Sequence, residues 1–100
     1  MKEQQLQITD KDVTRLSSVF RSLGKVKLKV LLYLYFRPYK THREIRDRLG
    51  YHGDTIRNVL LGARRQGIVE KINGKYKLTS PGKRLVEGAV ELIAAMKEEG

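Results

Sequence analysis

A short stretch at residues 68–79, IVEKINGKYKLT, constrains the fold more than any other part of the 100-residue chain. Asn73-Gly74 stands between two alternating segments, and both residues accept the positive φ angles of a two-residue type I′ turn. The stretch is therefore predicted to form a β-hairpin of fixed register. The predicted pairs are Val69 with Leu78, Glu70 with Lys77, Lys71 with Tyr76, and Ile72 with Lys75. Val69, Tyr76 and Leu78 then share the face that we expect to meet the core.

Two helices are predicted immediately before the hairpin. Residues 41–50, THREIRDRLG, open with Thr41 and Glu44 at capping-box spacing and close at Gly50. After the turn GYHG, residues 54–66 repeat apolar positions at spacings of three and four, which is typical of an amphipathic helix. Its inward residues are expected to be Ile56, Val59, Leu60 and Ala63.

Three further helices are predicted outside this unit. Residues 9–23 begin with a weak capping box at Thr9 and Asp12 and carry one apolar stripe. Residues 25–36, KVKLKVLLYLYF, fit a strand in their alternating first half, but their length and the lack of an earlier turn favour a buried helix. Residues 80–98 begin near Pro81, which is favoured in a first helical turn. We expect residues 1–8 to be a flexible tail and residues 9–100 to be a single domain, because a chain of this length supports one core.

Basic residues dominate the charge of the chain. Twenty-one Lys and Arg stand against eleven Asp and Glu, which gives a formal net charge of +10. A surplus this large in a short chain indicates an anionic partner, with nucleic acid ahead of an anionic membrane surface or an acidic protein. The alternative is a soluble protein whose basic surface has no such partner.

Other classes of function find little support in the sequence. The chain has no cysteine, which excludes disulfides and cysteine nucleophiles and suits an intracellular protein. No apolar run approaches the roughly 18 residues of a membrane span, and the polar N-terminus is unlike a signal peptide. His42 and His52 lack companions at metal-ligand spacing, so we expect no metal and no other cofactor. No catalytic motif is visible and no small-molecule ligand is indicated, so we do not expect an enzyme.

The predicted order of elements is helix, helix, short helix, tight turn, helix, hairpin, helix. Residues 41–87, THREIRDRLGYHGDTIRNVLLGARRQGIVEKINGKYKLTSPGKRLVE, contain the polar cap, two helices, QGIVE, the hairpin and the LTSPGKRL start of a last helix. With this pattern, residues 25–84 resemble the winged helix-turn-helix of small prokaryotic transcription regulators and archaeal DNA-binding proteins. The resemblance implies a mainly α fold with a small β-hairpin and extra helices at both ends. It also implies a cytoplasmic, nucleoid-associated protein.

The segment 54–66 is predicted to be a recognition helix. In helix-turn-helix proteins the second helix lies in the major groove of DNA and contacts bases with its N-terminal residues. Arg suits guanine, Asn suits adenine, and apolar groups suit the thymine methyl. The expected base-contacting residues are Thr55, Arg57, Asn58 and Leu61, and the alternative for them is a solvated helix face. Gly62 lies inside this helix at a cost of about 1 kcal/mol relative to Ala; a close DNA backbone and tight helix packing are both open explanations.

The other DNA contacts are expected at phosphates. The start of the helix at residues 41–43 offers free backbone N–H groups, and the hairpin would lie as a wing on the backbone or in the minor groove. The candidates are Thr41, His42, Arg43, Tyr51, His52, Arg64 and Arg65, together with Lys71, Asn73, Lys75 and Lys77 of the wing. Turn packing for Tyr51 and His52, and a solubilising role for the lysines, are the alternatives.

The first and last helices exceed what a minimal winged helix needs. Their three-four apolar repeats also fit a helix–helix seam between two chains, so we expect a homodimer through residues 80–98, assisted by the first helix. The expected interface residues are Val13, Leu16, Phe20, Leu85, Ala89, Leu92, Ile93 and Met96. The alternative is that these helices cover the chain's own core. A two-fold dimer implies a palindromic or inverted-repeat DNA site.

Three functions therefore compete. The first is a dimeric, sequence-specific regulator of transcription that binds double-stranded DNA. The second is an architectural chromatin protein of the same fold with little sequence preference. The third is a winged-helix module that binds other proteins, against which the basic wing and the arginines weigh.

Overall fold

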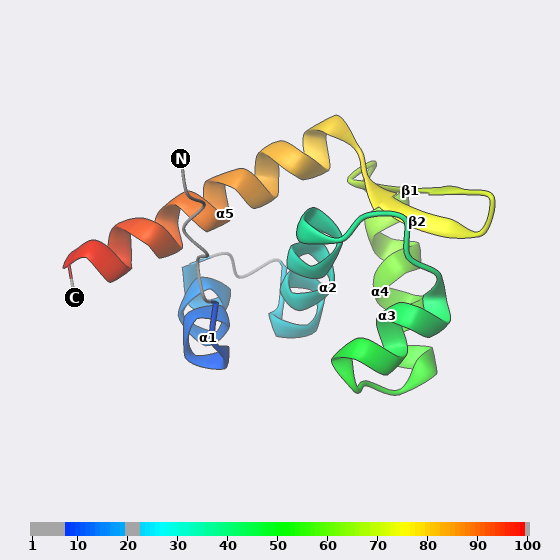
Figure 1. Ribbon diagram of the computed structural model, residues 1–100, viewed down its shortest axis with the longest axis horizontal. Coiled ribbons are helices and arrows are strands. Elements are labelled where there is room, and N and C mark those ends of the chain that lie inside the picture. Colours follow the sequence, from blue (N-terminus) through cyan, green and yellow to red (C-terminus); the bar gives the residue numbers. More distant parts are fainter. Residues whose placement is uncertain (1–7, 20–22, 100) are drawn as a thin grey trace.

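The computed structural model describes residues 8–19 and 23–99. Its elements are α1 (Asp10–Val19), α2 (Lys25–Phe36), α3 (His42–Leu49), α4 (Gly53–Arg65), β1 (Val69–Ile72), β2 (Lys75–Leu78) and α5 (Ser80–Glu99). Figure 1 shows the hairpin at one end of the molecule beside α3 and α4, while α1 lies toward the other end and α5 runs along one side. The predicted order of elements is confirmed.

Helix α2 forms the centre of the core. Leu28, Leu31 and Leu34 are among its fully buried side chains, and α1, α3, α4, α5 and β2 all contact it. This resolves the choice between strand and helix at residues 25–36. The second half of this sequence is apolar on every side because several elements surround the helix, so neither a helical stripe nor a strand alternation is required there.

Helix boundaries follow the capping signals. The hydroxyl oxygen of Thr41 accepts the N–H of Glu44, and the Glu44 carboxylate accepts the N–H of Thr41, so the predicted capping box is present. Gly50 ends α3 in the left-handed conformation, at φ 76°. Thr9 and Asp12 exchange the same two kinds of hydrogen bond at the start of α1. These local pairs fix where both helices begin.

The hairpin has the predicted register, with all four expected pairs present. Asn73 and Gly74 have φ values of 51° and 78°, as a type I′ turn requires. Val69, Tyr76 and Leu78 are buried, which confirms the core face. Lys40 adds an unpredicted bridge, exchanging two backbone hydrogen bonds with Tyr76. The hairpin is thereby tied to the loop between α2 and α3.

The start of α5 is fastened to the base of the hairpin. The hydroxyl of Thr79 accepts the N–H of Gly82 and donates to the carbonyl of Gly67. The backbone of Gly82 passes so close to Ile68 that an added Cβ would overlap the Ile68 carbonyl oxygen and lie 3.0 Å from the carbonyl carbon. Glycine is needed here for close approach of two backbones, which the sequence did not indicate.

The helices α1 and α5 contribute side chains to the core of the single chain. Val13, Ala89 and Ile93 are buried in the chain's own core, and their expected place in a dimer interface stays a prediction. A helical repeat has the same spacing whether it meets its own core or a partner. Leu85, Leu92 and Met96 are half-buried and retain surface for a partner. The side chains of Leu16 and Phe20 lie outside the described residues.

Ion pairs also hold α1 in place. Asp10 pairs with Lys29 of α2 at 2.8 Å, and Asp12 pairs with Lys97 of α5 at 3.1 Å. The hydrogen bond from the N–H of Thr9 lowers the pKa of Asp12, and Lys97 lowers it further. The expected tail lies outside the described residues except for its last position, residue 8, which packs against the core. No helix in the described part of the chain is long and apolar enough to cross a membrane.

Candidate nucleic-acid interface

Helix α4 divides cleanly into a buried and an exposed face. Ile56, Leu60 and Ala63 are buried against the core, as predicted. Val59, the fourth residue expected to face inward, is half-buried against the core. The exposed side chains of the helix are those of Asp54, Arg57, Asn58, Leu61, Arg64 and Arg65. Leu61 keeps 41% of its surface exposed. Thr55 is half-buried at the edge of the exposed face.

Gly62 faces open space on this helix. A Cβ built at this position meets no atom of the described residues within 4 Å. Tight packing against another helix is therefore the wrong explanation for this glycine. The close approach of a DNA backbone remains as an expectation.

A histidine in the first turn of α3 holds that helix to the start of α4. The Nε2 of His42 lies 2.9 Å from the carbonyl oxygen of Gly53, which accepts its hydrogen. Tyr51 is half-buried, with the ammonium of Lys29 5.6 Å from its ring centre. His52 precedes α4 and is exposed. Tyr51 therefore packs within the chain as its alternative supposed, whereas His52 is exposed, and DNA contact by either residue stays a prediction.

The start of α3 is less open to phosphate than the sequence suggested. The capping box occupies the hydroxyl and the N–H of Thr41 and brings the Glu44 carboxylate to the helix start. The hydrogen bond from Thr41 lowers the pKa of Glu44, and the positive charges of Lys40 and Lys75 lower it further. Arg43 is exposed in the first turn of the helix. Arg43 and the two lysines therefore form a basic group beside the start of α3.

The hairpin lysines divide between its two faces. Lys71 lies 5.5 Å from the ring centre of Tyr76. It lines a shallow groove between α4 and β1 together with Leu61, Arg64, Arg65, Val69 and Glu70. Lys75 and Lys77 are on the opposite face of the hairpin, as the register requires. Two basic areas therefore flank the hairpin: one beside α4, and one beside the start of α3.

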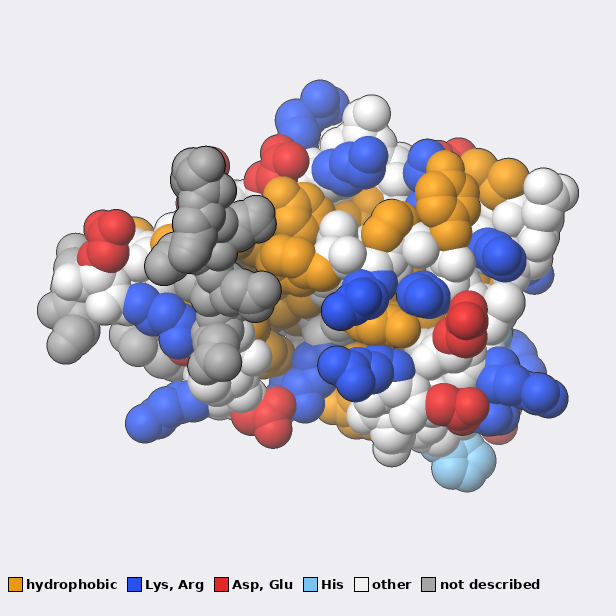
Figure 2. Space-filling model, in the orientation of Figure 1, with side chains coloured by type: hydrophobic (Ala, Val, Ile, Leu, Met, Phe, Trp, Pro, Cys, Tyr) orange, Lys and Arg blue, Asp and Glu red, His pale blue; other side chains and the backbone are white. Residues whose placement is uncertain are grey.

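Lys77 is more enclosed than predicted. Its ammonium lies 5.1 Å from the ring centre of Tyr39 and donates to the Tyr39 hydroxyl at 3.2 Å. Glu70 stands 4.0 Å from the same ammonium. Lys77 is half-buried, whereas Asn73 and Lys75 are exposed. Figure 2 shows Lys and Arg side chains spread over the end of the molecule that carries α3 and the hairpin, with hydrophobic side chains gathered between α2 and α5.

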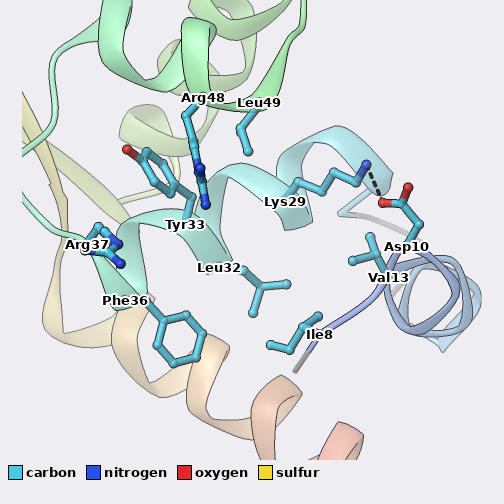
Figure 3. A pocket seen from close by; sticks show the side chains of 10 residues that line it. All are labelled: Ile8, Asp10, Val13, Lys29, Leu32, Tyr33, Phe36, Arg37, Arg48 and Leu49. Atoms are coloured by element: carbon cyan, nitrogen blue, oxygen red, sulfur yellow. Dashed lines mark ion pairs between the residues drawn. The ribbon is translucent and has the colours of Figure 1, made fainter. Parts of the chain in front are cut away.

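A separate hollow of about 410 Å³ opens among α1, α2 and α3. Its apolar wall includes Leu32 and Phe36, and the guanidinium groups of Arg37 and Arg48 lie along another side (Figure 3). None of the expected DNA-contacting residues lines it. Its walls come from distant segments, so no pattern in the sequence indicated it. The expectation of no small-molecule ligand stays a prediction.

The described residues offer no group of three or more His, Cys, Asp or Glu side chains that could hold a metal ion. The exposed face of α4 and the hairpin carry amide, lysine and arginine side chains, and their contacts with bases and phosphates stay a prediction. Such an arrangement can bind and distinguish DNA but brings no catalytic group together.

Comparison with known proteins identifies the fold. No protein-family model matches the chain, and no curated protein matches it in sequence. MepR, a transcription regulator of the Staphylococcus aureus multidrug efflux pump MepA, superposes with a TM-score of 0.77 at 22% identity, over 89% of this chain and 70% of MepR. A MepR–DNA complex gives a TM-score of 0.74 at 20% identity, over 89% and 79% of the two chains.

A second regulator gives the same result. The MarR-family protein Rv2887 of Mycobacterium tuberculosis, in complex with DNA, superposes with a TM-score of 0.75 at 18% identity, over 92% of this chain and 72% of Rv2887. Each of these similarities spans about nine tenths of this chain. The chain therefore has the winged helix-turn-helix fold of these transcription regulators, as its sequence predicted.

Proposed function

We propose that the chain is a transcription regulator that binds double-stranded DNA in a sequence-specific manner, as a homodimer. The observation that carries the proposal is the exposed polar face of α4, in a chain of net charge +10. It lies beside a groove whose charged lining is Arg64, Arg65 and Lys71 with one acid, Glu70. Structures of the same fold in complex with DNA support it. A helix of this kind fits the major groove, where the base edges differ between all four base pairs.

The exposed face of α4 has the chemistry for reading bases. Asn58 can donate to and accept from adenine, and Leu61 offers an apolar contact for a thymine methyl. These two residues stand three positions apart, so they lie on the same side of the helix. Arg57 and Thr55 flank them near the N-terminal end, which in helix-turn-helix proteins is the end nearest the bases.

The two basic areas beside the hairpin are placed to bind phosphates. Arg64, Arg65 and Lys71 form the area beside α4, and Arg43 and Lys75 belong to the area beside the start of α3. Lysine and arginine contacts of this kind supply affinity and register without sequence information. The hairpin then acts as the wing, on the backbone or in the minor groove.

Dimerisation is proposed through α5. This helix has 20 residues. Leu85, Leu92 and Met96 pack against the core but stay half-buried, so part of each side chain is exposed. A second copy would cover these side chains and place two recognition helices about one DNA turn apart. The DNA site would then be an inverted repeat.

Selection of bound sequences from random duplexes tests the proposal. A regulator should yield one preferred inverted repeat and bind it about 10³-fold or more tightly than random DNA. The high net charge also suits an architectural protein. That protein would bind every duplex with similar affinity and yield no preferred sequence, whereas a protein-binding module would not bind duplex DNA at low salt.

A further inference from the structure

Asp54 is an acidic residue on the helix that is proposed to enter the DNA groove, where a carboxylate is unfavourable. It is the only Asp or Glu between residues 48 and 69, and its side chain is 77% exposed in the first turn of α4. A carboxylate that approaches a duplex is repelled by the phosphates. Its role at this end of the helix is therefore different from the phosphate-binding role of the basic residues.

The Asp54 carboxylate is engaged by a neighbour on the same helix. Its Oδ1 accepts from Nη1 of Arg57 at 2.7 Å, across the i, i+3 spacing that places two side chains side by side. Both side chains are largely exposed, so the pair adds little to the stability of the fold. Its effect is geometric, because it restricts the orientation of a planar guanidinium that carries further N–H donors.

We propose that Asp54 is a positioning residue that aims Arg57 at one guanine in the major groove. An unrestrained arginine beside a duplex can turn to the nearest phosphate, whereas a held guanidinium presents two donors to the O6 and N7 of guanine. The carboxylate also makes phosphate contact at this point unfavourable. This inference rests on the proposed function and names the feature that separates sequence reading from uniform binding.

The position of Arg57 agrees with this role. Arg57, Leu61 and Arg64 follow one another at spacings of four and three, so they form one row along α4. The C-terminal members of that row line the groove toward β1, where phosphate contacts are proposed. Arg57 is the member nearest the N-terminal end, which is the end that meets the bases. In this proposal the N-terminal end of the row contacts bases and its C-terminal end contacts the DNA backbone.

Affinities of single-residue variants for matched duplexes test the proposal. The duplexes are the preferred sequence from the selection experiment, all its single base-pair changes, and a random sequence, each at several salt concentrations. Arg57→Ala should reduce discrimination about tenfold at one G·C pair. Asp54→Asn should reduce it at the same pair, while affinity for the random duplex stays equal or rises. The double variant should lose no more discrimination than Arg57→Ala alone, because Asp54 acts through Arg57.

Two further variants exclude a purely structural effect. Arg57→Lys keeps the charge but lacks the planar fork, so it should lose discrimination at the G·C pair and keep its salt dependence. Asp47→Asn removes a matched exposed carboxylate, which pairs with Arg46 at 2.9 Å on α3, and should leave base preference unchanged. Melting temperatures of all variants show whether each remains folded.

The proposal is overturned if Asp54→Asn leaves base preference intact, weakens all duplexes equally, or acts at a different base pair from Arg57→Ala. If the wild-type protein binds every duplex alike, the proposed function itself fails, and this inference fails with it. The two failures are distinguishable, because the variants can be compared for base preference only if the wild-type protein has such a preference.

Discussion

Two glycines of α5 provide a matched test of how this helix is fastened to the hairpin. Gly82 passes close to the backbone of Ile68, whereas a Cβ added at Gly88 meets no atom of the described residues within 4 Å. Replacing a helical glycine with alanine stabilises a helix by up to about 1 kcal/mol. Gly88→Ala should therefore raise the free energy of unfolding by that amount.

Gly82→Ala should do the opposite. Overlap of a new Cβ with backbone costs typically about 1–3 kcal/mol, and more where the neighbour cannot move. Here the Ile68 carbonyl also accepts the N–H of Thr79 at 3.1 Å, so a shift of the carbonyl breaks a second contact. After subtracting the gain in helix propensity, we expect a net loss of about 2 kcal/mol.

Thermal unfolding at one fixed protein concentration measures both variants. A difference of about 3 kcal/mol between them corresponds to a gap in Tm on the order of 15 °C for a domain of this size. The concentration is held constant because association shifts the apparent stability. Equal Tm values for the two variants, or a Gly82→Ala protein more stable than wild type, would refute the close approach on which the estimate depends.

Three other perturbations follow from the structure. Gly62→Ala should stabilise the fold by about 1 kcal/mol yet weaken binding to duplex DNA; unchanged affinity in a titration would show that no DNA backbone comes close to this position. Thr41→Ala should lower the free energy of unfolding in urea by about 1 kcal/mol through loss of the cap, and no change would mean that the Glu44 pairing has no energetic role. For Asp12, hydrogen bonding from Thr9 and the charge of Lys97 lower the folded pKa, so its contribution is complete above the unfolded pKa near 4 and is lost as pH falls through the folded value. The stability difference between wild type and Asp12→Asn should therefore be constant above about pH 5 and shrink below pH 4, and a difference independent of pH would contradict this assignment.

Features set by neighbours in sequence were predictable in detail. Asn73-Gly74 determined the turn, the register and the buried face of the hairpin, because a two-residue turn leaves one way to pair the strands. Thr41 and Glu44 determined the start of α3, because the box needs only residues three positions apart. The exposed face of α4 also followed from its periodicity.

Features set by contacts between distant segments were not predictable. Nothing near Gly82 in sequence indicates that Ile68 lies against it, and nothing near Lys77 indicates that Tyr39 covers it. The helical periodicity indicated that Val13 and Ile93 lie on an apolar face. It could not distinguish packing against the chain's own core, where both are buried, from packing against a partner. The hydrogen bond from His42 to Gly53 likewise depends on how α3 and α4 cross.

The central claim is that the exposed face of α4 reads bases while the hairpin holds the backbone. Comparing Asn58→Ala with Lys75→Ala on the preferred duplex, its single base-pair changes and random DNA tests it most directly. Asn58→Ala should relax preference at one base pair, at a cost of about 1–3 kcal/mol there, whereas Lys75→Ala should weaken all duplexes equally and reduce the salt slope by about one. If Asn58→Ala instead weakens every duplex alike, α4 does not lie in the major groove as proposed.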